Sequence, residues 1–113
     1  MASITISCPH LNDPAKRTFA VKGTYDLDGK GASGNVTCTV IHPTAGAFPQ
    51  STPVTSAGTW CFLFNNLPET PPGGVAFIVV TLTSPPVGLL ATTSLSSFTI
   101  KANGTVDCGG SCP

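Results

Sequence analysis

Five cysteines carry the most distinctive chemistry in this chain. The candidates for disulfide bonds are Cys8, Cys38, Cys61, Cys108 and Cys112. An odd count leaves at least one thiol unpaired, or paired with a second chain. A C-terminal tail that folds back would bring Cys108 or Cys112 to Cys8, but the sequence leaves the connectivity open.

Metal binding is the alternative chemistry for these residues. Cys108 and Cys112 have a CxxxC spacing, but no second close pair of cysteines or histidines completes four zinc ligands. Asp26 and Asp28 resemble a fragment of a calcium loop, yet no distal Glu follows them, and we interpret the segment as a turn. We therefore expect no metal and no cofactor.

Groups suited to catalysis are scarce. The two histidines, His10 and His42, each adjoin a proline in turn-like segments, and Glu69 is the single glutamate. A paired-carboxylate site is therefore not evident, and a Cys-His nucleophile pair has no local signature. We predict that the protein is not an enzyme.

Charge is unusually sparse and unevenly placed. Charged residues make up 9% of the 113 residues, against about 25% in a typical globular protein. Five basic and five acidic residues cancel, and between residues 31 and 100 only Glu69 is charged. A neutral chain offers no electrostatic footprint for nucleic acid or an acidic membrane surface, and no apolar run approaches the roughly 20 residues of a membrane span. We expect protein partners instead.

The elements that position these residues are predicted to be strands. Thr, Val, Ile and Phe recur with period two between Pro- and Gly-rich turns. The expected strands cover 3–8, 18–25, 35–41, 59–65, 75–83 and 93–101, with a short extra strand within 43–53. Cys8 is expected on the same face as Ile4 and Ile6, and the Leu89-Leu90 pair in a loop.

This pattern predicts an all-β fold, an antiparallel sandwich of about seven strands. We expect one domain over residues 1–102 and a Gly/Cys-rich tail over 103–113. The predicted core residues are Trp60, Phe62, Phe98, Ile78 and Val80.

Three motifs resemble the bacterial immunoglobulin-like domain family. They are Gly58-Thr59-Trp60 with the following Phe62 and Phe64, then Asn66-Leu67-Pro68, and finally Ser97-Phe98-Thr99-Ile100. Members of this family occur as tandem modules in surface adhesins and as single modules on phage virion proteins. The resemblance implies an immunoglobulin-like sandwich and roles in adhesion or assembly. Cysteines are uncommon in the family, so this chain departs from it there.

The scarcity of charge between residues 31 and 100, taken with this resemblance, leads to an expectation about function. A free monomer normally carries mixed surface charge that limits self-association. We expect a structural protein, a subunit that decorates or cements a phage capsid or virion as a homo-oligomer or assembly subunit. The alternative is an adhesion or binding module of a bacterial surface or secreted protein. The N-terminus has no basic or long apolar region of a signal peptide, which favours location at the virion surface over the extracellular alternative.

Overall fold

A computed structural model describes residues 2–8, 17–30, 33–85, 87–102 and 104 of the chain. These residues form antiparallel strands, and no helix among them is long and apolar enough to cross a lipid bilayer. The strands are β1 (Ser3–Cys8), β2 (Phe19–Asp26), β3 (Gly34–His42), β4 (Gly46–Val54), β5 (Ala57–Phe64), β6 (Ala76–Ser84) and β7 (Gly88–Phe98).

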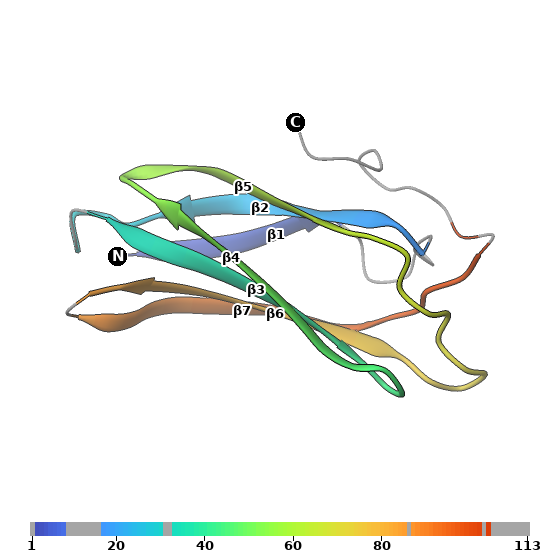
Figure 1. Ribbon diagram of the computed structural model, residues 1–113. Coiled ribbons are helices and arrows are strands. Elements are labelled where there is room, and N and C mark those ends of the chain that lie inside the picture. Colours follow the sequence, from blue (N-terminus) through green and yellow to red (C-terminus); the bar gives the residue numbers. More distant parts are fainter. Residues whose placement is uncertain (1, 9–16, 31–32, 86, 103, 105–113) are drawn as a thin grey trace.

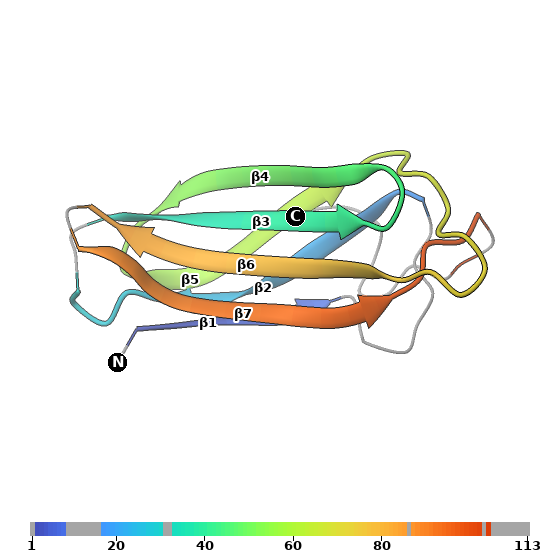
Figure 2. The same ribbon diagram turned by 90° about the horizontal axis from the view of Figure 1, so that it is seen from below.

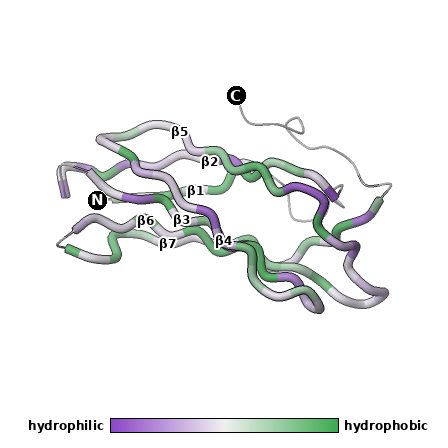
Figure 3. Tube along the Cα trace, viewed as in Figure 1, coloured by the Kyte–Doolittle hydropathy of each residue, from purple (hydrophilic) through white to green (hydrophobic). Residues whose placement is uncertain are grey.

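The strands pack as two layers, which confirms the prediction of an all-β sandwich (Figure 1). One sheet has three strands in the order β1-β2-β5, and the other has four in the order β4-β3-β6-β7. Figure 2, turned by 90°, looks onto the four-stranded sheet with the smaller sheet behind it. The most hydrophilic segments lie mainly at the turns at the two ends of the sandwich (Figure 3).

The space between the sheets is filled by apolar side chains that alternate along each strand. Trp60, Phe62, Phe98, Ile78 and Val80 are all buried there. The indole Nε1 of Trp60 donates a hydrogen bond to the backbone oxygen of Thr24 over 3.2 Å, which satisfies its polar atom inside the core. Its ring lies over Gly23, where a Cβ atom would sit 2.6 Å from the indole, so only glycine fits beneath it.

The core is aromatic at the end of the sandwich where β2 begins and where β5 and β7 finish. The ring of Phe19 stacks on Phe64 with centroids 5.7 Å apart and meets the edge of Phe98 at 5.6 Å. Both arrangements are favourable for aromatic pairs beyond the area that they bury. These three residues come from β2, β5 and β7, so they fasten the two sheets together.

Two predicted elements were wrong in extent. The stretch 43–53 was expected to hold only a short strand, but β4 is nine residues long. The last strand was expected from residue 93, whereas β7 begins at Gly88, and the predicted loop residues Leu89 and Leu90 belong to it. Gly88 has a φ of +97°, which lets the chain turn tightly after Pro85 and re-enter the sheet early.

Candidate functional site

His42, which was expected in a turn-like segment beside Pro43, instead ends a strand and has a structural position. It is the last residue of β3, and its side chain is buried. Its Nε2 donates to the backbone oxygen of Pro68 over 2.9 Å, and its Nδ1 accepts from the backbone nitrogens of Thr44 and Ala45 at 3.1 Å each. Both ring nitrogens therefore tie two loops together, and neither is left for proton transfer to a substrate.

The residues of the Asn66-Leu67-Pro68 motif also have structural partners. Asn66 has a φ of 56°, which turns the chain after β5, and Leu67 inserts into the core. The backbone nitrogen of Leu67 donates to the oxygen of Arg17 over 2.8 Å, and Arg17 Nε donates back to the oxygen of Leu67 over 2.8 Å. The motif thus anchors the loop after β5 to the chain entering β2.

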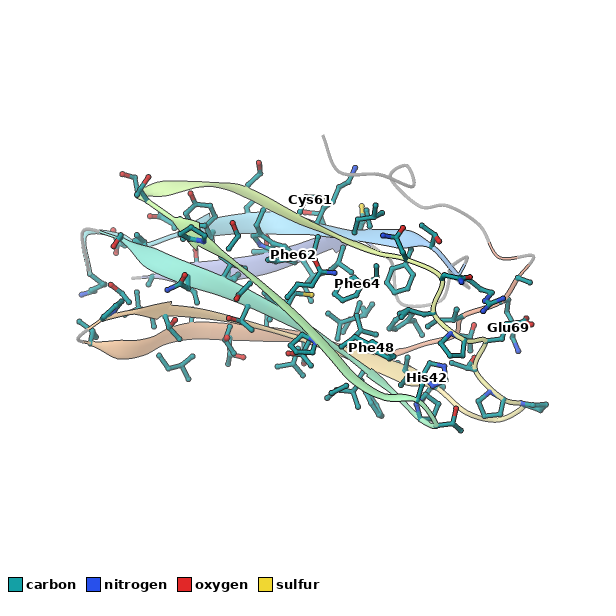
Figure 4. All side chains as sticks on the ribbon, in the orientation of Figure 1. His42, Phe48, Cys61, Phe62, Phe64 and Glu69 are labelled. Atoms are coloured by element: carbon teal, nitrogen blue, oxygen red, sulfur yellow. The ribbon has the colours of Figure 1, made fainter. Side chains whose placement is uncertain are left out.

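Glu69 continues this anchoring one residue beyond the motif. Its Oε2 accepts a hydrogen bond from the backbone nitrogen of Ala102 over 2.9 Å. The backbone nitrogen of Thr70 donates to the oxygen of Ile100 over 3.0 Å, and the nitrogen of Ile100 donates to Thr70 Oγ1 over 3.2 Å. The end of the described chain is therefore held beside the loop after β5, as Figure 4 shows for the position of Glu69.

The acidic segment after β2, which was interpreted as a turn rather than a calcium loop, forms a tight turn. Asp26 Oδ1 accepts a hydrogen bond from the backbone nitrogen of Asp28 over 2.8 Å, an arrangement that stabilises tight turns. Asp28 and Gly29 have φ values of 50° and 70°. Among the described residues, no three His, Cys, Asp or Glu side chains gather in a way that could hold a metal ion, and no pocket opens.

The three described cysteines occupy two environments. Cys38 is a free thiol in the centre of β3, completely buried between the sheets. Burial removes the Cys38 side chain from water, which disfavours the charged thiolate and raises the pKa of Cys38 to about 12. Cys8 and Cys61 are not free thiols, because the sulfur atom of each is in a disulfide bond. Cys108 and Cys112 lie outside the described residues.

Cys8 and Cys61 share the outer face of the small sheet. Both are paired with Lys22, which lies on the central strand β2 between them. Residues paired across neighbouring strands point to the same face, and the neighbours Val21 and Gly23 point into the core. Figure 4 shows Phe62 and Phe64 directed between the sheets and Cys61 on the other side of β5. We call the set Cys8, Ala20, Lys22, Cys61 and Leu63 the cysteine face.

The expectation that Cys8 shares a face with Ile4 and Ile6 was wrong. The register of β1 shifts between Ile6, which pairs with Gly23, and Cys8, which pairs with Lys22. A bulge of one extra residue reverses the faces of everything after it. Simple alternation along the sequence cannot reveal such a shift, because the bulge is defined by the partner strand.

The outer face of the four-stranded sheet has a different character, and we call it the open face. The strand register gives its members as Asn35, Thr37, Thr39, Ile41, Ala47, Pro49, Ser51, Pro53, Phe77, Val79, Thr81, Thr83, Leu89, Thr92 and Ser94. None of these side chains is charged and none is buried. The face therefore combines exposure with a complete lack of charge across four strands.

Apolar side chains gather at the two ends of the open face. At one end Ile41 and Phe77 are directly paired and are 38% and 43% exposed. At the other end Leu89 is 61% exposed, beside the turn residue Val87 at 60%. Exposed apolar side chains in a group of this kind are typical of contact surfaces.

The threonine row across the middle and the prolines of β4 complete the open face. Thr37, Thr81 and Thr92 lie side by side on β3, β6 and β7. Pro49 and Pro53 lie on β4, which is the edge strand. Since proline has no N–H to give to β3, these positions must direct their backbone nitrogens away from the sheet. They leave gaps in the row of donors along this edge, which hinders the addition of another strand.

Comparison with known proteins adds no assignment. No protein-family model matches the sequence, and no characterised protein matches it significantly. The geometry of the two outer faces therefore carries the functional argument.

Proposed function

We propose that this chain is a non-enzymatic structural protein that works through protein-protein contacts made by its open face. In this proposal it is an immunoglobulin-like subunit that decorates or cements a phage capsid or virion, at the virion surface. The observation that carries the proposal is the charge-free open face, with Ile41, Phe77 and Leu89 exposed on it.

The physical reason is the cost of removing surface groups from water. A buried charge without a partner costs several kcal/mol, whereas threonine and apolar side chains lose little. The centres of protein interfaces are accordingly depleted in charged residues. An uncharged face is also compatible with a second copy of itself, because no like charges meet when two such faces pack together.

The size of the face favours repeated contacts over a single tight pair. Four strands about 4.8 Å apart and seven residues of about 3.4 Å each give a face of about 19 Å by 24 Å. This is smaller than the roughly 800 Å² that each partner commits to a standard stable interface. A contact of this size is weak by itself and becomes strong when many copies act together, as on a capsid.

The strand order supports the immunoglobulin-like part of the proposal. In a variable-type immunoglobulin sandwich, an extra strand joins the edge of the sheet that holds the third, sixth and seventh main strands. Here β4 lies at that edge beside β3, followed by β6 and β7, while β1, β2 and β5 form the other sheet. The buried Trp60 lies on β5 rather than on the third strand, so the match is in topology and not in that core residue.

The alternative function is an adhesion or binding module of a bacterial surface or secreted protein, with an extracellular location. The bonded sulfurs of Cys8 and Cys61 favour it, because stable cross-links between cysteines persist outside the reducing cytoplasm. A virion meets the same oxidising conditions after it leaves its host, so this observation is compatible with both functions.

The test compares a charge introduced on each outer face. Sedimentation velocity of the wild-type chain over a range of concentrations should show reversible self-association. Phe77→Lys places a charge on the open face and should weaken this association at least tenfold. Thr59→Lys places the same charge at an exposed position on the outer face of the small sheet and should leave it unchanged. A wild-type chain that stays monomeric at high concentration would argue against an assembly subunit and leave the binding module as the better proposal.

A further inference from the structure

The cysteine face contains two side chains that are buried although they point away from the core. Cys8 and Ala20 are each 2% exposed. Neither belongs to the cluster of apolar residues that fills the space between the sheets. On the open face, by contrast, no outward side chain is buried. Their burial on an outward face points to cover from a part of the chain outside the described strands.

The two bonded cysteines of this face cannot be joined to each other. They lie on β1 and β5, with Lys22 of β2 between them. Two strand spacings place their Cα atoms about 10 Å apart, and a disulfide tolerates no more than about 7 Å. Cys38 is a free thiol in the core. Two cysteines of the chain remain as partners, Cys108 and Cys112.

We propose that the C-terminal segment 105–113 lies across the cysteine face and is fastened there by two disulfide bonds. One joins Cys8 and the other joins Cys61 to the two cysteines of the Cys108-Gly-Gly-Ser-Cys112 motif. The occupant of this face is thus the chain's own tail. The inference does not depend on what binds the open face.

The spacing of the motif fits the distance that it must cross. Four residues of extended chain reach up to about 14 Å, so Cys108 and Cys112 can stand above β1 and β5 with Lys22 beneath them. Gly109 and Gly110 have no side chain that would hold the segment away from the sheet. A CxxC spacing would reach only about 11 Å at full extension and would leave little freedom for the geometry of the two bonds.

The last described residues also lie close to one end of the small sheet. Its last hydrogen bonds join Ala102 to Glu69 and Gly104 to Lys101. Glu69 follows Leu67, which pairs with Arg17 just before β2 begins. The last described residues are therefore tied to the end of the small sheet where β2 begins and β5 finishes, and Lys22 lies three residues into β2 from its start at Phe19. The four residues from Gly104 to Cys108 are long enough to cover this distance.

The covalent chemistry is thiol-disulfide exchange. Each protein disulfide forms when two cysteine thiols react with one low-molecular-weight disulfide such as oxidised glutathione. The thiols lose two electrons and two protons, and the small disulfide is reduced to two thiols. Two such exchanges complete the pair of bonds and leave Cys38 reduced.

Peptide mapping of the intact, oxidised chain tests the proposal without any variant. Trypsin cleaves after Lys16, Lys30 and Lys101, which places Cys8, Cys61 and the CxxxC motif in three different peptides. We expect a single species that joins the three peptides and separates into three masses on reduction. A chymotryptic digest, cleaving between Cys38 and Cys61, should assign the bond to Cys61. Either assignment of Cys108 and Cys112 supports the proposal.

Three outcomes would overturn it. These are a C-terminal peptide that carries its own Cys108-Cys112 bond, bonds between two copies of the chain, and free thiols at Cys8 and Cys61. A second measurement uses the double variant Cys108→Ser/Cys112→Ser, with Ser111→Ala as the matched control. Alkylation of Cys8 in the native protein should occur in the double variant at least tenfold faster than in the control, in which Cys8 is bonded. Equal alkylation of Cys8 in both would contradict the proposed cover.

Discussion

The two outer faces of this sandwich are built from similar strands but differ in three properties. The cysteine face carries the charge of Lys22, two bonded sulfurs and two buried outward side chains. The open face carries no charge, no cysteine and no buried outward side chain. The first has the properties of a face closed by its own chain, and the second those of a face prepared for a partner. The difference separates what stabilises this fold from what it offers to other molecules.

The largest expected effect concerns the cross-links of the cysteine face. Cys108→Ser/Cys112→Ser should lower the free energy of unfolding by about 2–5 kcal/mol for each bond lost, because a cross-link restricts the unfolded chain. Urea unfolding followed by Trp60 fluorescence measures this loss. Ser111→Ala should unfold like the wild type. Equal stability of the double variant and the wild type would mean that the two faces do not differ in this way.

The next effect separates the cysteine inside the sandwich from those on its surface. Burial raises the pKa of Cys38 from 9.0 to about 12, so the unfolded chain loses this proton at lower pH than the folded one. The stabilisation is complete below pH 9 and is lost as the pH rises to about 12, by up to about 4 kcal/mol. Cys38→Ala should lower the stability by a constant amount and remove this part of the pH dependence. Parallel pH profiles for the two proteins from pH 9 to 12 would contradict the assignment.

A smaller effect is expected from charge on the open face. Phe77→Lys should weaken self-association at least tenfold, equivalent to about 1.4 kcal/mol, because the ammonium group must be removed from water in the contact. Since Phe77 is 43% exposed, folding should be preserved in this variant. Thr59→Lys provides the control on the other sheet. Equal association constants for the two variants would remove the distinction between the faces.

The smallest effect on folding is expected at the edge of the open face. Pro49→Val gives β4 an additional outward N–H and should change the free energy of unfolding by less than about 1 kcal/mol. It should also raise the rate of aggregation through the β4 edge, which light scattering at high concentration can follow. Thr92→Val, on β7, is the matched control. If both variants stay equally clear, the prolines do not protect this edge.

The sequence predicted the core well because its signal is local. Trp60, Phe62 and Phe64 alternate on one strand, and Ile78 and Val80 alternate on another, so a period of two is sufficient to place them. The strand β4 was underestimated because Pro49 and Pro53 normally interrupt strands. Their compatibility with β4 depends on its position at the edge of the sheet, which is a tertiary property.

The two faces were less predictable because their members meet only through strand pairing. The bulge after Ile6 moves Cys8 to the surface, and a second irregularity lets Leu90 and Ala91 both pack against the core while Leu89 stays outside. The scarcity of charge between residues 31 and 100 did predict a neutral surface. That the uncharged outward residues gather on one sheet follows from the strand order β4-β3-β6-β7, and the sequence pattern does not predict this order.

The most direct test of the difference between the faces is hydroxyl-radical footprinting of the wild-type chain at low and high concentration. We expect oxidation of Phe77 and Leu89, on the open face, to slow as the concentration rises. Oxidation of Leu63, on the cysteine face, should stay constant. Unchanged rates for Phe77 and Leu89, or slower oxidation of Leu63 alone, would contradict the assignment of the open face as the contact surface.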